Sequence, residues 1–136
     1  MIYLDTSVAL AHLLAEDHRP PAGLWEERLV ASRLLEYEMW NRLHARELGR
    51  THGDGLRLLL ARVSFLELSR EVLERALHPF PGDVRTLDGL HLASAAYLRQ
   101  NGASIAVATY DERMREAANG MGLNLYEPGR LRGDAD

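Results

Sequence analysis

The sequence predicts an α/β protein with three layers, in which a short, mostly parallel five-stranded sheet lies between two layers of helices. Short apolar runs alternate along the chain with segments of helical composition, and strands that alternate with helices form parallel sheets. Leucine occurs 25 times, against 8 times for valine and isoleucine together, which favours helices with few strands. The 136 residues fit one domain, which we place at residues 1–128 with a polar tail at 129–136.

Five short apolar runs are predicted to be the strands. The first is Ile-Tyr-Leu near the N-terminus, and the third alternates apolar and polar residues, as a strand with one covered face does. The fourth is the clearest, because it is apolar and rich in small and β-branched residues. In chain order the expected strands lie at residues 2–4, 29–31, 63–68, 105–108 and 123–126.

Helices are predicted between these strands, and most begin at a residue that caps helices. Side-chain oxygens of Asp, Ser and Thr accept hydrogen bonds from the free N–H groups of a first turn, and such residues stand at positions 5, 32, 69, 86 and 111. Proline and glycine mark the ends, and the glycines at 49–55 predict a turn region. The expected helices span residues 8–15, 22–27, 33–48, 56–62, 70–77, 87–100 and 112–119.

The composition excludes several kinds of chemistry. There is no cysteine, which excludes disulfides, thiolate zinc sites, iron–sulfur clusters and cysteine nucleophiles. All 16 basic residues are arginine, so mechanisms that need lysine, such as P-loop phosphate binding and Schiff bases, are excluded as well. The net charge of −4 argues against a general coat for nucleic acid, because such proteins are basic. Any contact with nucleic acid must be local, through arginines or a bound cation.

No segment predicts export or insertion into a membrane. The N-terminus lacks a basic segment and carries an acid at position 5, unlike a secretory signal. No apolar run approaches the length of about 20 residues that a membrane helix needs. We therefore expect a cytoplasmic protein.

Two aspartates follow predicted strands directly. Asp5 comes after the first strand and Asp111 lies just past the fourth. Parallel strands bring both residues to the carboxyl edge of the sheet, where the functional crevice of such sheets lies. Helix capping explains each position when it is taken singly. Two carboxylates at one edge favour a site.

Two further acids lie on predicted helices. Asp88 shares a helix face with Leu92, where an ionised carboxylate is costly unless it is paired or bound to a metal. The alternative for Asp88 is stabilisation of the helix dipole in a first turn. Glu38 borders the apolar face of the long helix, and its alternative is a surface pair with Arg42. Glu36 competes for the same role but lies farther round the helix.

Convergence of these four carboxylates would require a cation. Several carboxylates within a few ångströms cannot all stay ionised in a dry site without one. Oxygen ligands in a chain without cysteine favour a hard ion, Mg²⁺ or Mn²⁺. Such ions support hydrolysis of phosphodiesters, and they supply positive charge where the phosphate binds.

Four sequence motifs together resemble the PIN-domain ribonucleases, and within that family the VapC-type toxins of bacterial toxin–antitoxin pairs. Each motif alone is weak, but the ordered set spans essentially the whole chain, and the segment 122–128 also fits. The motifs are Ile2-Tyr3-Leu4-Asp5-Thr6-Ser7, Ser32-Arg33-Leu34-Leu35-Glu36-Tyr37-Glu38, Arg85-Thr86-Leu87-Asp88-Gly89-Leu90-His91-Leu92-Ala93 and Ala108-Thr109-Tyr110-Asp111-Glu112-Arg113.

The resemblance implies a PIN-like fold and a Mg²⁺- or Mn²⁺-dependent endoribonuclease that acts as the toxin of such a pair. It also implies an RNA substrate, a homodimer and a cognate antitoxin that inserts a segment into the active-site groove. By this resemblance Thr6 and Thr109 support the site by hydrogen bonds. The catalytic, metal-binding acids that it implies are Asp5, Glu38, Asp88 and Asp111.

Some alternatives stay open at this level. Arg85 and Arg113 are candidates for phosphate binding, but they could equally pair with the acids beside them. His91 is better explained as a buried residue satisfied by a neighbour than as a group that orients a carboxylate or contacts substrate. A catalytically silent PIN-like module that binds RNA or protein is the alternative function. Haloacid-dehalogenase phosphatases are disfavoured, because they need an aspartate where this chain has Ser7, and a lysine.

Overall fold

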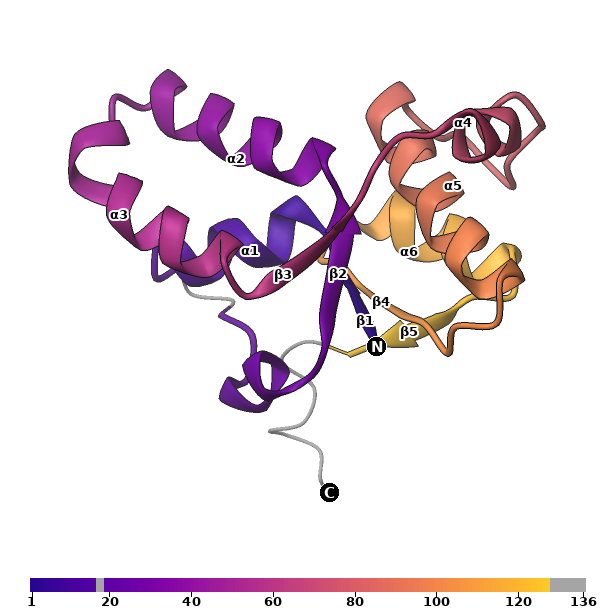
Figure 1. The fold of residues 1–136 in the computed structure, drawn as a ribbon, viewed down its shortest axis with the longest axis horizontal. Coiled ribbons are helices and arrows are strands. Elements are labelled where there is room, and N and C mark those ends of the chain that lie inside the picture. The colour runs from indigo at the N-terminus through magenta and orange to yellow at the C-terminus, as the bar shows by residue number, and fades with distance from the viewer. Residues whose placement is uncertain (17–18, 128–136) are drawn as a thin grey trace.

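The computed structural model describes residues 1–16 and 19–127 and confirms the predicted α/β sandwich (Figure 1). One sheet contains five strands in the order β3-β2-β1-β4-β5, and every neighbouring pair is parallel. The strands are β1 (Ile2–Leu4), β2 (Leu29–Ser32), β3 (Val63–Leu66), β4 (Ala106–Ala108) and β5 (Asn124–Tyr126).

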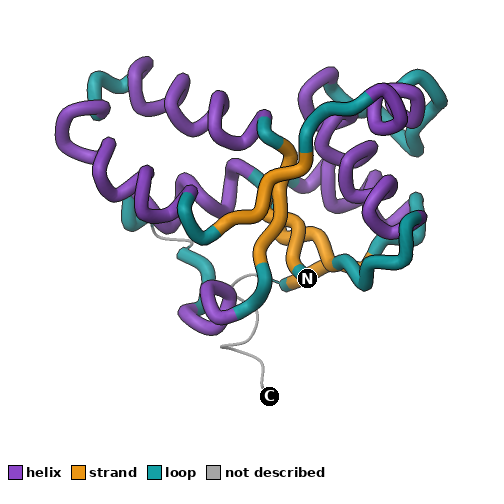
Figure 2. Tube along the Cα trace, viewed as in Figure 1, coloured by secondary structure: helices purple, strands orange, loops and turns teal. Residues whose placement is uncertain are grey.

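Helices cover both faces of this sheet, as Figures 1 and 2 show. The helices α1 to α3 lie on one side, and α4 to α6 lie on the other. A short 3-10 helix, η1 (Ala22–Glu26), precedes β2. The α-helices are α1 (Thr6–Leu13), α2 (Leu34–Ala45), α3 (Gly49–Leu60), α4 (Arg70–Ala76), α5 (Thr86–Gln100) and α6 (Glu112–Gly120).

Alternating strand residues divide the core between the two faces. In β1, Ile2 and Leu4 pack with the apolar side chains of α1, α2 and α3. Tyr3, between them, points to the opposite face and packs with Leu92 of α5 and Met114 of α6. This is the period of two expected of a strand that is buried on both faces.

The predicted turn at residues 49–55 is wrong, because this whole segment belongs to α3. Two of its glycines lie at the contact between α2 and α3. A Cβ atom at Gly53 would lie 3.2 Å from the ring of Trp40, and one at Gly49 would lie 3.3 Å from the ring of His44. The turn instead lies directly after α2, which ends earlier than expected, and Glu47 has a positive φ of 56° there.

The other helix and strand boundaries differ from the predicted ones by a few residues at most. Ser32 ends β2 instead of starting α2, although its Oγ still accepts a hydrogen bond from the N–H of Leu34. None of the helices in the described part of the chain has the length and apolar character needed to cross a membrane. Pro128 and the tail at 129–136 lie outside the described residues.

Candidate active site

Sheet register brings the residues that follow β1 and β4 together. Leu4 pairs with Ala108, and the N–H of Asp5 donates to the carbonyl of Ala108 at 3.0 Å. Asp5 and Thr109 therefore stand beside each other at the carboxyl edge of the two central strands. Both are buried. This is the edge at which the sequence predicts a site.

Asp5 is held by hydroxyl groups on both sides. Its Oδ2 accepts hydrogen bonds from Thr109 Oγ1 at 2.8 Å and from Ser7 Oγ at 2.7 Å, as well as a longer bond from the N–H of Ser7. Both hydroxyls are fixed in turn, because Ser7 Oγ accepts from the N–H of Tyr110 and Thr109 Oγ1 accepts from that of Asp111. Asp5 thus caps α1 and is also hydrogen-bonded to β4 and to Thr109 directly after it. Its role as a helix cap is therefore compatible with a role in a functional site.

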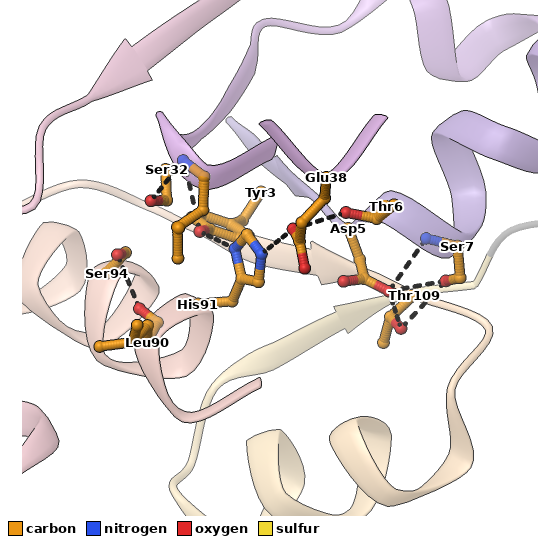
Figure 3. A network of polar contacts seen from close by, with 11 residues as sticks. Tyr3, Asp5, Thr6, Ser7, Ser32, Glu38, Leu90, His91, Ser94 and Thr109 are labelled. Atoms are coloured by element: carbon orange, nitrogen blue, oxygen red, sulfur yellow. Dashed lines mark hydrogen bonds and ion pairs between the residues drawn. The ribbon is translucent and has the colours of Figure 1, made fainter. Parts of the chain in front are cut away.

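Glu38 is held from two other elements (Figure 3). Its Oε1 accepts from Thr6 Oγ1 at 2.8 Å and from His91 Nε2 at 2.6 Å. Burial opposes its ionisation, but the hydrogen bond and charge of His91, the bond from Thr6 and the charge of Arg42 outweigh that effect, so the pKa of Glu38 lies below its usual value. The competing residue Glu36 instead pairs with Arg33 at the surface.

His91 lies fully buried in α5 with a partner on each ring nitrogen. The Nδ1 atom contacts the hydroxyl of Tyr3 at 2.7 Å, and Nε2 contacts Glu38. Burial lowers the pKa of His91, but the bond to Glu38 and the negative charges of Glu38, Asp5 and Asp88 outweigh it, so its pKa lies above the usual value. The histidine is therefore satisfied by neighbours, as expected, and one of those neighbours is a candidate site residue.

Asp88 and Asp111 lie at the N-termini of α5 and α6 and are partly exposed. Asp111 caps α6, because its Oδ1 accepts from the N–H groups of Arg113 and Met114. The carboxylate of Asp88 accepts no hydrogen bond from the residues that the structure describes. Helix capping accounts for one oxygen of Asp111 and for neither oxygen of Asp88.

The electrostatic environment of Asp88 reflects the other three acids. Desolvation, followed by the negative charges of Asp111 and Asp5 and more weakly that of Glu38, raises the pKa of Asp88 above its usual value. Within residues 1–16 and 19–127, no arginine forms an ion pair with any of the four carboxylates. Among the described residues the predicted acids thus form a negative site with no arginine in an ion pair, and His91 is the only basic side chain within ion-pair distance of one of them.

Each of the four carboxylates keeps at least one oxygen without a donor among the described residues. Such oxygens, in a set without sulfur ligands, fit a hard divalent cation. In the described part of the chain no three of these side chains are arranged to ligate one ion directly. Mg²⁺ usually binds one or two carboxylates and keeps several waters, so this spacing is compatible with an ion held partly through water.

The two predicted arginines do not pair with the acids beside them. Arg113 lies 3.8 Å from Asp83, and both side chains are largely exposed. Arg85 is exposed and forms no ion pair in the described residues. Neither guanidinium is occupied by Asp88 or Asp111, which leaves both able to contact a phosphate.

The sequence analysis missed two residues of the site. Ser7 contributes a hydroxyl to Asp5, and its position in the first turn after Asp5 was a usable signal. Tyr3 contributes its hydroxyl to His91, and only the alternation of β1, which points Tyr3 towards α5, hinted at that contact.

Comparison with known proteins gives consistent matches over most of the chain. The family described as PIN domain matches residues 2–120. The chain is 30% identical to ribonuclease VapC35 of Mycobacterium tuberculosis over 141 residues, covering 97% of this chain and 100% of that protein. It is also 30% identical to ribonuclease VapC46 of the same organism, covering 93% of this chain and 97% of that protein. Ribonuclease VapC47 matches at 30% identity over 97% of this chain and 100% of its own length.

Proposed function

The chain belongs to the PIN domain family, and from this premise we propose that it is a divalent-metal-dependent endoribonuclease, the toxin of a VapC-type toxin–antitoxin pair. The observation that carries the proposal is the group of four carboxylates at the carboxyl edge of the sheet. Desolvation, and then repulsion from the other acids, raises the pKa of Asp88, and no arginine in the described residues forms an ion pair with any of the four. A site of this charge suits a cation that in turn attracts a phosphodiester.

We assign the metal-binding role to Asp5, Glu38, Asp88 and Asp111, and we expect Mg²⁺ or Mn²⁺. A bound ion of this kind supplies a Lewis acid that activates water and stabilises charge on the phosphate. The protein's own part is positioning. Hydroxyls of Thr109 and Thr6 direct Asp5 and Glu38, respectively.

Substrate and partners follow from the family assignment. The substrate is RNA, and Arg85 and Arg113, exposed beside the acids, are placed to contact its phosphates. A cognate antitoxin that blocks the groove and a homodimer complete the proposal. The alternative, a silent module that binds RNA or protein, is less favoured, because a module without catalysis has no need to keep all four acids together.

The proposal is tested with the substitution Asp5→Asn. The variant should fold, bind Mn²⁺ far more weakly in a calorimetric titration, and cleave total cellular RNA about 10²- to 10³-fold more slowly, since a divalent ion contributes several kcal/mol to such a reaction. The matched control is Asp54→Asn, an exposed aspartate of α3 paired with Arg57, which should behave like the parent protein.

Full cleavage by Asp5→Asn would falsify the assignment of this residue. Binding of Mn²⁺ by the parent protein without cleavage of any RNA would instead favour the silent module.

A further inference from the structure

A continuous path of hydrogen bonds leads from the backbone of β2 to Glu38 (Figure 3). The N–H of Ser32 donates to the hydroxyl oxygen of Tyr3 at 3.0 Å. The hydroxyl of Tyr3 lies 2.7 Å from His91 Nδ1, and His91 Nε2 lies 2.6 Å from Glu38 Oε1. Tyr3, Ser32 and His91 are fully buried, so no water competes for these bonds.

A donor at one end and an acceptor at the other give this path a direction. A backbone N–H can only donate, so the oxygen of Tyr3 accepts from Ser32, and its own proton is available to His91 Nδ1 whenever that nitrogen carries no hydrogen. At the other end, an ionised carboxylate can only accept, so Nε2 of His91 must carry a hydrogen. Of the two neutral forms of the ring, the one with its hydrogen on Nε2 satisfies both ends, whereas the protonated ring would donate from both nitrogens. The opposite tautomer would set a lone pair of Nε2 against Glu38 Oε1.

The bond from His91 decides how Glu38 is presented. Together with Thr6 Oγ1 it occupies Oε1 of Glu38, and no described residue donates to Oε2. In Figure 3 this second oxygen points towards Asp5. Metal-binding side chains are commonly oriented in this way by partners that do not touch the ion.

We propose that Tyr3 and His91 are positioning residues, with Tyr3 selecting the ring tautomer of His91, and His91 holding Glu38 so that a single oxygen faces the cation site. This inference rests on the proposed role of Glu38 as a metal ligand. It adds to that role two buried residues that never contact the ion or the RNA.

Three substitutions test the hydrogen bonds from Tyr3 to His91 and from His91 to Glu38. His91→Leu removes the donor to Glu38 and should raise the Kd for Mn²⁺, measured by calorimetry, about 10- to 100-fold. His91→Gln keeps an amide N–H at the reach of the ring Nε2 and should restore the Kd to within about threefold of the parent value. Tyr3→Phe should weaken Mn²⁺ binding by about tenfold through the loss of a fixed tautomer.

A spectroscopic measurement on the metal-free protein follows the tautomer directly. In ¹H–¹⁵N spectra recorded at a pH where the ring is neutral, the His91 signals, identified by their absence in His91→Gln, should show hydrogen on Nε2 in the parent protein. They should show a mixture of tautomers in Tyr3→Phe. The matched control is Tyr97→Phe, at the far end of the same helix, which should change neither the spectrum nor the Kd.

Several results would overturn the inference. They are unchanged Mn²⁺ binding in a folded His91→Leu variant, a Kd for His91→Gln as weak as for His91→Leu, and an Nδ1–H tautomer in the parent protein. Failure of the proposed function looks different: the parent protein would neither bind Mn²⁺ nor cleave RNA, whatever the tautomer of His91.

Discussion

The four acids of the site form two pairs that the protein holds in different ways. Asp5 and Glu38 accept their hydrogen bonds from side chains of other elements, namely Thr109, Thr6 and His91, with Ser7 as a local addition. Among the described residues, Asp111 accepts only from the backbone of its own helix, and Asp88 accepts no hydrogen bond. We call Asp5 and Glu38 the locked pair, and Asp88 and Asp111, at the N-termini of α5 and α6, the loose pair.

The two pairs therefore differ in what they contribute: one supplies oxygens in fixed positions and the other supplies mainly negative charge. In the proposed metal site, the locked pair, Asp5 and Glu38, would present oxygens whose positions are settled before an ion binds, which would lower the cost of ordering a ligand on binding. The loose pair adds negative charge, and desolvation together with the resulting repulsion raises the pKa of Asp88. We expect substitutions in the two pairs to differ in stability as well as in activity.

The largest effect should come from Asp88→Asn. Loss of a metal-binding carboxylate should reduce RNA cleavage by about 10²- to 10³-fold. The same change removes a desolvated charge and its repulsion from Asp111 and Asp5, so the metal-free variant should melt a few degrees higher than the parent protein. Thermal melting without metal, compared with cleavage assays, measures both effects. A variant less stable than the parent would contradict the view of Asp88 as a strained carboxylate.

The pH dependence of that gain provides its control. Because the pKa of Asp88 is higher in the folded protein than in the unfolded chain, the folded state binds more protons between the two values. The free energy of unfolding therefore falls as the pH rises through this window. The stability advantage of Asp88→Asn should be full at neutral pH and should disappear in acid, where Asp88 is protonated in both states.

A smaller effect is expected when the lock on Asp5 is loosened. Thr109→Val keeps the shape of this buried side chain but removes the hydroxyl that donates to Asp5 and accepts from Asp111. Calorimetry should show a Kd for Mn²⁺ raised about 10- to 100-fold. Thr109→Ser retains the hydroxyl and should restore most of the affinity. Thr51→Val, on the surface of α3, is the control for loss of a threonine hydroxyl.

Equal affinity in Thr109→Val and the parent protein would show that Asp5 needs no lock. The contrast between the two pairs of acids would then have no functional meaning.

The smallest effect should come from the arginines beside the loose pair. Arg113→Ala and Arg85→Ala should each raise KM for RNA a few-fold with little change in kcat, because binding of a phosphate contributes before and during the reaction alike. The slope of log KM against log salt should flatten by up to about 0.7 for each phosphate that the variant no longer binds. Arg57→Ala, on α3, should leave both quantities unchanged. An unaltered salt dependence in both arginine variants would place the RNA elsewhere.

Features of the fold that depend on a few neighbouring residues could be predicted from the sequence. The apolar run of β1 followed by Asp5 marks a strand end and a helix start in six residues, and the segment around Asp111 does the same. The beginning of α3 could not be predicted in this way. Its glycines resemble a turn locally, but two of them, Gly53 and Gly49, lie at a contact with Trp40 and His44 of another helix.

The sequence by itself determined the layered arrangement of sheet and helices and the edge of the sheet at which Asp5 and Asp111 lie. Both follow from apolar periodicity and helix capping, which depend on residues only a few positions apart. Only the tertiary structure decided which partners hold each acid. Thr6 follows Asp5 in sequence but donates to Glu38, and His91 joins Tyr3 and Glu38 across 88 and 53 positions of the chain. Hydrogen bonds are short and directional, so such contacts depend on where whole helices pack, which no local pattern encodes.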